Sequence, residues 1–101
     1  MKKIGFSEAR RRVLQCLKSR NFQHEQRNNI DEKNLLATGD IDEDSIAKCI
    51  RRSTGKYHTS SAHHYDSQTE VHIIKKEGWY IKFYFAEIQT DDFTVFISVH
   101  R

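Results

Sequence analysis

The last third of the chain, residues 69–101, alternates between two kinds of side chain with a period of two. After the acidic pair 91–92 the alternation starts again and runs to residue 100. Strict alternation in β-branched and aromatic residues predicts half-buried strands. One predicted face carries Trp79, Ile81, Phe83, Phe85, Phe93, Val95, Ile97 and Val99. A third run, Thr69–Lys75, precedes these strands and turns at 76–78, so the pattern predicts an antiparallel meander with one apolar face.

The opposite face of this meander carries groups that transfer protons and stabilise anions. By parity, Tyr80 and Lys82 of one strand share that face with Ser98 and His100 of the next. His72 of the first run is a further candidate for the same face. A solvated sheet face more usually carries Thr, Glu and Lys, so this set is a candidate functional site. The alternative is that these are ordinary solvated sheet residues.

The first half of the chain predicts helices. Ser7 is a good N-cap for a first helix with an apolar stripe at Val13 and Leu17. Asp31 caps a predicted short helix, Glu32–Thr38, and Asp42 caps a third with Ile46 and Ile50 on its buried side. Residues 21–29 show no periodicity and are predicted to form a loop. With 101 residues the chain predicts one domain, 1–101, of the α+β class, with helices packed on one face of a small antiparallel sheet.

Charge is unevenly distributed. Residues 1–30 hold eight Lys or Arg and two acids, whereas the remainder is slightly acidic. A basic N-terminal face suits a polyanion, and nucleic acid suits it better than a membrane because no strongly apolar stripe accompanies the charges. A merely soluble helix face is the alternative. The candidate RNA-binding residues are Arg10, Arg11, Arg51, Arg52 and Gln68.

Several classes of protein are not favoured by the sequence. Cys16 and Cys49 have no CxxC or Cys/His ligand spacing, so buried reduced thiols in a cytoplasmic protein are expected. The start of the chain lacks the apolar core of a signal peptide, and no window approaches transmembrane length. Adjacent His63 and His64 would point to opposite faces of a strand without a third ligand, so neither a metal nor another cofactor is predicted.

The segment 56–68, KYHTSSAHHYDSQ, has no hydrophobic period and is rich in Lys, His, Tyr and Ser. A polar linker between a helix and a sheet edge is a common place for a site. The predicted order of segments along the chain is therefore helix, short helix, helix, polar linker and meander. The stretches that define this order are FSEARRRVLQCLKSRNF, NLLATGDIDEDSIAKCI, KYHTSSAHHYDSQTEVHII, GWYIKFYF and FISVHR.

This order of segments resembles the MqsR family of toxins from toxin–antitoxin pairs, which is related to the RelE-like endoribonucleases. The resemblance implies a RelE-like fold, metal-independent cleavage of single-stranded mRNA and a cognate antitoxin as partner. Tyr80 stands at the family's active-site tyrosine. The chain departs from the family at two lysine positions, which here hold His58 and His100. Lys56 lies on the other side of Tyr57 from His58. The family's glutamine position is also shifted, since Thr69 aligns with it and Gln68 precedes it.

Metal-free RNA cleavage needs a base for the 2′-hydroxyl, a cation for the charged phosphorane and an acid for the 5′-oxygen. His58 and His100 are the candidates for base and acid, in either order. Lys82 and Lys56 would hold the phosphate, and Tyr80 would donate to it or position it. Two other functions remain open: a small non-catalytic RNA-binding module, and an immunity- or antitoxin-like domain that binds a protein partner through its sheet edge. The histidines favour catalysis, because a passive RNA surface would use Arg and Lys.

Overall fold

The computed structural model describes residues 3–25 and 33–101. Within these residues, three helices and a 3₁₀ turn accompany five strands, so the predicted α+β class is confirmed. The helices are α1 (Phe6–Ser19), α3 (Leu35–Thr38) and α4 (Glu43–Arg52), followed by the turn η1 (Gly55–Tyr57). The strands are β1 (Phe22–His24), β2 (His58–Ala62), β3 (Glu70–Lys76), β4 (Trp79–Ile88) and β5 (Asp91–His100).

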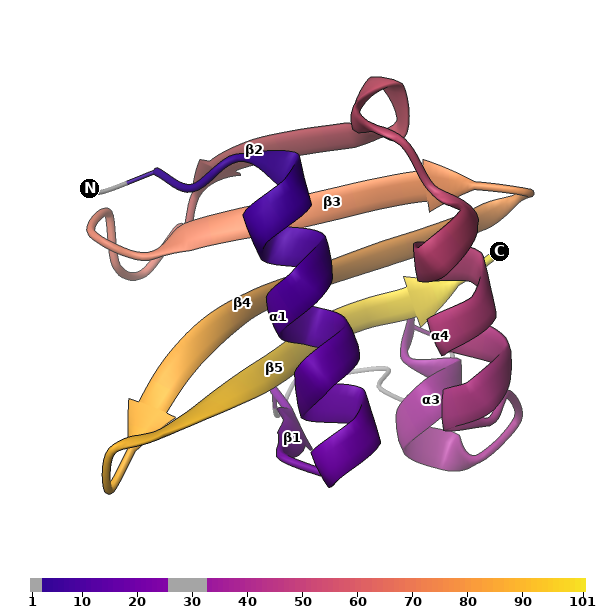
Figure 1. Cartoon of the computed structure of the whole chain (residues 1–101), viewed down its shortest axis with the longest axis horizontal. Coiled ribbons are helices and arrows are strands. Elements are labelled where there is room, and N and C mark those ends of the chain that lie inside the picture. Colours follow the sequence, from indigo (N-terminus) through magenta and orange to yellow (C-terminus); the bar gives the residue numbers. More distant parts are fainter. Residues whose placement is uncertain (1–2, 26–32) are drawn as a thin grey trace.

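The strands form one sheet in the order β1-β5-β4-β3-β2, and α1 and α4 lie across the same face of it (Figure 1). Strands β3 to β5 form the predicted antiparallel meander, and β2 extends it by pairing antiparallel to β3. Strand β1 pairs parallel to β5, so the prediction of a purely antiparallel sheet is wrong and the sheet is mixed. The parallel strand comes from the segment predicted as a loop, in which Phe22–His24 pair with the edge of β5. A strand of three residues is too short to show a period in the sequence.

The helix ends depend on local capping. Helix α1 begins at Phe6 after an extended Gly5 with no side-chain cap, so the predicted Ser7 cap is wrong and Ser7 lies within the first turn. Asp42 caps α4 as predicted, because its Oδ1 accepts the backbone N–H of Ser45 at 2.7 Å. Helix α3 is capped by Asn34, whose side chain accepts from the Ala37 N–H at 3.1 Å. The predicted cap for that helix, Asp31, lies outside the described residues.

The core lies between the two long helices and the sheet face that they cover. Val13 and Leu17 of α1 pack with Ile46 and Ile50 of α4 in one apolar cluster, as predicted. The sheet contributes Ile74, Ile81, Phe83, Phe96 and Val99 to the same cluster. Both cysteines are buried and free. None of the helices in the described ranges has both the length and the apolar character needed to cross a membrane.

A β-bulge in β5 changes which of its residues face the helices. Lys82 pairs with Ser98 but the next residue, Phe83, pairs with Phe96, so Ile97 is an extra residue in the ladder. Because a bulge inverts the alternation beyond it, Phe96 and Val99 both join the core. The prediction that Val95 and Ile97 pack against the helices is therefore wrong, although both side chains are buried.

Candidate functional site

The sheet face opposite α1 and α4, here called the distal face, carries a group of side chains from three strands. Lys75 of β3 pairs with Tyr80 of β4, and Tyr80 pairs with His100 of β5. Lys82 of β4 pairs with Ser98 of β5 one row further along the sheet from this set. Directly paired residues share a face, so Tyr80, Lys82, Ser98 and His100 converge as the alternation predicts. We call these four residues and Lys75 the distal cluster.

The rings and charges of the distal cluster are in contact. The Tyr80 and His100 rings are stacked with centroids 5.0 Å apart and planes 20° apart. The Lys75 ammonium lies 5.6 Å from the centre of the Tyr80 ring. Tyr80, Lys82 and His100 are half-buried, so their polar ends reach the surface while their stems pack on the sheet. Lys75 was not among the predicted site residues, because His72 was the candidate that the run 69–75 offered for this face.

The protonation pattern of His100 follows from one hydrogen bond. Its Nδ1 lies 3.1 Å from the main-chain oxygen of Arg101. A carbonyl oxygen only accepts, so in the neutral ring Nδ1 carries the proton and Nε2 has the lone pair. This tautomer leaves Nε2 able to accept a proton from a bound group. Within the distal cluster, His100 is thus the side chain best suited to act as a base.

His58 does not join the distal cluster. Its register partner in β3 is Ile74, a core residue, so His58 faces the helices. Its ring lies 5.4 Å from the Phe6 ring of α1, and its Nε2 is 2.9 Å from Nδ1 of His72. The predicted acid–base pair of His58 and His100 is therefore wrong as a single site. The linker has no hydrophobic period, so the sequence gives no strand register and leaves the face of His58 undetermined.

The helix-covered face carries its own chain of ionisable groups. His72 is 1% exposed, and its Nε2 lies 3.6 Å from Oε1 of Glu70. Burial lowers the pKa of His72 to about 4, although the nearby Glu70 charge opposes the shift. Burial also lowers the pKa of His58. Both rings are consequently neutral at pH 7. His72 was predicted as a candidate for the opposite face, and that placement is wrong.

Lys56 is placed apart from Lys82. It lies on η1 with its ammonium 5.2 Å from the centre of the Tyr57 ring, and Lys76 approaches the same ring at 4.1 Å. A hydrogen bond from Lys76, together with the charges of Lys56 and Lys76, lowers the pKa of the Tyr57 hydroxyl. The linker thus contributes a basic, phenol-bearing corner formed by Tyr57, Lys56 and Lys76.

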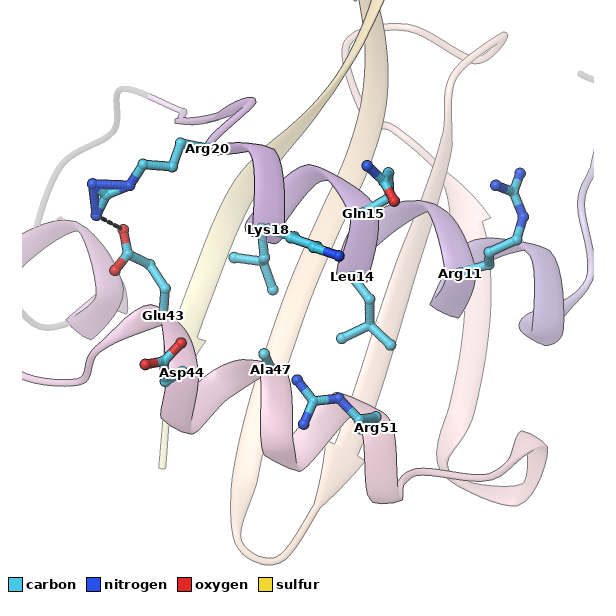
Figure 2. A pocket seen from close by; sticks show the side chains of 10 residues that line it. Arg11, Leu14, Gln15, Lys18, Arg20, Glu43, Asp44, Ala47 and Arg51 are labelled. Atoms are coloured by element: carbon cyan, nitrogen blue, oxygen red, sulfur yellow. Dashed lines mark hydrogen bonds and ion pairs between the residues drawn. The ribbon is translucent and has the colours of Figure 1, made fainter.

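Two of the predicted RNA-binding arginines line a groove between α1 and α4 of about 630 Å³ (Figure 2). Arg11 of α1 and Arg51 of α4 lie along its sides, and Leu14 points toward α4 between them. Arg20 pairs with Glu43 at 2.8 Å at the other end. We call this hollow the helix groove. It lies on the helix layer, on the other side of the sheet from the distal cluster.

The other three predicted RNA-binding residues do not line the helix groove. Arg10 donates to the Ser53 carbonyl at 3.1 Å, which ties α1 to the end of α4. Arg52 pairs with Glu77 at the β3–β4 turn. Gln68 lies in the loop before β3 and lines a small pocket with Glu70. These positions favour structural roles for the two arginines over a shared RNA surface.

His63 and His64 follow the end of β2 with their rings stacked and the centroids 5.1 Å apart, so they do not point to opposite faces of a strand. His63 Nδ1 accepts the backbone N–H of Tyr65 at 3.1 Å, so its Nε2 carries the proton and donates to Glu25 Oε1 at 3.0 Å. Both ring nitrogens are therefore occupied in holding the loop after β2 to the end of β1. Within residues 3–25 and 33–101, no group of three or more His, Cys, Asp or Glu side chains is arranged to hold a metal ion.

Comparison with known proteins adds no relative: no family model, no curated protein and no solved structure matches this chain.

Proposed function

We propose that this protein is a metal-independent endoribonuclease that cleaves single-stranded mRNA, the toxin of a type II toxin–antitoxin system with a RelE-like fold. The observation that carries the proposal is the stacked pair of Tyr80 and His100 beside two lysines on the distal face. The resemblance of the segment order to MqsR-family toxins supports the same activity. An enzyme that acts on mRNA would work in the cytoplasm.

The distal cluster offers each group that cleavage requires. His100 Nε2 accepts the 2′-hydroxyl proton, and the 2′-oxygen then attacks the phosphorus. Lys75 and Lys82 balance the negative charge of the phosphorane. The 5′-oxygen leaves with a proton from the Tyr80 hydroxyl or the Lys82 ammonium. The products are a 2′,3′-cyclic phosphate and a free 5′-hydroxyl, and His58 has no part in this scheme.

A non-catalytic RNA-binding module is the second candidate. The separation of His58 from His100 favours it, because the two predicted proton-transfer groups do not face one phosphate. Lysines beside an exposed aromatic edge bind single-stranded RNA without cleaving it. The two candidates use the same face, so binding alone does not distinguish them.

We also propose that the helix groove receives the partner, a cognate antitoxin. The groove combines an apolar floor at Leu14 and Ala47 with the cations Lys18 and Arg51 and with Arg11, which pairs with Glu8. The acids Glu43 and Asp44 lie at the end near Arg20. An acidic amphipathic segment would place an apolar side chain on the floor and its carboxylates against the cations. Such a segment would leave the distal cluster on the other side of the sheet uncovered.

The deciding experiment incubates the purified protein with a long single-stranded RNA in EDTA and maps the product ends. Cleavage to 2′,3′-cyclic phosphates is expected, with the rate lowered about 10²–10⁴-fold by His100→Ala, the usual value of a positioned base. His64→Ala is the matched control, because His64 is an exposed histidine outside the cluster. Bound but intact RNA at every pH would support the non-catalytic module instead.

A further inference from the structure

A shallow hollow of about 290 Å³ lies at the turn between β3 and β4, and we call it the hairpin hollow. The six consecutive residues that line it are Lys75, Lys76, Glu77, Gly78, Trp79 and Tyr80. Lys75 and Tyr80 also belong to the distal cluster. Lys76 also belongs to the basic corner around the Tyr57 ring, which we call the Tyr57 corner. The hollow therefore connects the distal cluster to a second group of cations.

The charge around the hairpin hollow is positive. The acid in its wall, Glu77, accepts two hydrogen bonds from Arg52, at 2.9 and 2.6 Å, so its charge is balanced. Lys56 and Lys76 lie against the Tyr57 ring instead, and no described acid pairs with either of them. Two ammonium groups held beside one phenol favour an anion in contact with both.

The hollow also offers aromatic surface. Trp79 and Tyr80 are both partly exposed. His100 of β5 stacks on the Tyr80 ring, and the hollow is lined by residues of β3, β4 and their turn, so it lies on the other side of that ring. The Arg101 guanidinium lies over the Trp79 ring at 4.5 Å. Aromatic rings among cations are typical of surfaces that bind the bases and phosphates of a single strand.

The opposite end of the distal face is covered. His63 follows β2 and Glu25 follows β1, which are the two edge strands of the sheet, yet His63 Nε2 and Glu25 Oε1 are 3.0 Å apart. The His63 ring lies 5.2 Å from the ring of Tyr84, which shares the distal face with Lys82. This strap blocks the path along β4 beyond Lys82. The path along β4 in the other direction leads to the hairpin hollow.

We propose that the hairpin hollow holds a base that flanks the scissile phosphate, and that the Tyr57 corner binds a further phosphate of the same RNA strand. This inference rests on the proposed function, because the distal cluster sets where the scissile phosphate lies. The volume of the hollow is just below the range of pockets for drug-sized ligands, which suits a single base. The Lys56 and Lys76 ammonium groups and the Tyr57 hydroxyl donate to the phosphate oxygens.

The test titrates the full chain with a 2′-O-methyl-RNA hexamer, which is not cleaved because its 2′-oxygens carry methyl groups. Trp79 is the single tryptophan of the chain, so its fluorescence reports on the hollow. A saturable change in Trp79 emission is expected with the hexamer. An abasic hexamer keeps the phosphates and should bind about tenfold more weakly, the usual effect of losing a stacked base, without the emission change.

Lys76→Gln removes one cation of the Tyr57 corner. It should weaken hexamer binding severalfold and reduce the slope of log affinity against log salt by about 0.7, the value of one phosphate contact on a single strand. Tyr57→Phe keeps the ring between the lysines and should weaken binding without changing the slope. Lys48→Gln is the matched control, because Lys48 is an exposed lysine of α4 outside the hollow and the corner, and it should change neither quantity.

The outcomes separate this inference from the proposed nuclease activity. Unchanged affinity and salt slope in Lys76→Gln, or the same emission change with inorganic phosphate or the abasic hexamer, would overturn the inference even if ordinary RNA is cleaved. Hexamer binding that depends on Lys76, together with intact ordinary RNA, would support the hollow and count against the nuclease. Absence of saturable hexamer binding would overturn the inference whatever the cleavage assay gives.

Discussion

The buried His72 makes the stability of this domain depend on pH in a range where carboxylates contribute little. Its ring is 1% exposed and lies against Phe83 and Phe85, with centroid separations of 5.6 and 5.5 Å. In the unfolded chain the same imidazole has an ordinary pKa of about 6.5, whereas in the fold it has a pKa of about 4. The folded state therefore resists a proton that the unfolded state accepts.

The sign and size of the effect follow from proton linkage. As pH falls below about 6.5 the unfolded state binds a proton that the folded state excludes, so the free energy of unfolding decreases until pH reaches about 4. Between pH 7.5 and pH 5 the His72 contribution amounts to about 2 kcal/mol, at roughly 1.36 kcal/mol per pH unit below 6.5. Burial lowers the pKa of His24 and His58 as well, and their contributions have the same sign.

The perturbation is His72→Phe, which keeps a ring against Phe83 and removes the ionisable nitrogens. The assay is urea unfolding at pH 7.5 and pH 5, with His64→Gln as a control at an exposed histidine. The wild-type midpoint should fall by about 1–2 M urea between the two pH values, given the usual denaturant dependence of small domains. The His72→Phe midpoint should fall much less.

Equal pH dependence in wild type and His72→Phe would refute a role for the buried ring. So would a wild-type protein that is as stable at pH 5 as at pH 7.5. A control that behaves like His72→Phe would mean that exposed histidines, and not the buried ring, account for the change.

Three further predictions concern the core, a helix cap and the division between the two faces. Phe83→Ala, at a fully buried position, should cost about 3–5 kcal/mol in a thermal or urea melt, and an unchanged melting temperature would contradict the assigned core. Asp42→Ala removes the α4 cap and should cost about 1 kcal/mol, whereas Asp40→Ala outside that cap should be close to neutral in the same melt. His58→Ala should leave the RNA cleavage rate within a few-fold of wild type, because His58 faces the helices, and a loss comparable to that of His100→Ala would show that His58 acts in the reaction.

Strong local patterns in the sequence predicted much of the fold. The alternation of β4 placed Ile81 and Phe83 in the core correctly, because a long half-buried strand imposes its period on the sequence. The stripe and cap of α4 were also predictable, since Asp42 satisfies a backbone donor within its own turn. The convergence of Tyr80 with His100 followed from parity in two adjacent strands of a meander.

The features of the fold that the sequence did not predict depend on pairing between strands, and no local sequence pattern indicates that pairing. Strand β1 is held by its partner β5, and three residues carry too little periodicity to be recognised. The face of His58 was set by its register with Ile74. Glu70 gave no signal at all, because a glutamate at the start of a strand is usually solvated, and its burial here depends on α1 and the residues before it.

The bulge at Ile97 shows how one residue links the core to the distal cluster. Phe96 and His100 are four residues apart and would share a face in a regular strand. In this protein Phe96 packs in the core while His100 pairs with Tyr80 on the distal face, because Ile97 is the extra residue between the two ladder segments. Bulges are frequent beside functional sites, where they redirect a side chain.

This arrangement gives a prediction that runs against the usual effect of a deletion in a strand. Removing Ile97 joins Phe96 directly to Ser98, so the ladder becomes regular while Val99 stays opposite Ile81 and His100 stays opposite Tyr80. The deletion variant should fold and retain RNA cleavage, with a loss of stability similar to that of Ile97→Ala, which keeps the bulge and loses the same buried side chain. Circular dichroism, urea unfolding and the cleavage assay would be compared for both variants. A folded deletion variant without cleavage, beside an active Ile97→Ala, would mean that the bulge itself shapes the site and that strand register alone does not place His100.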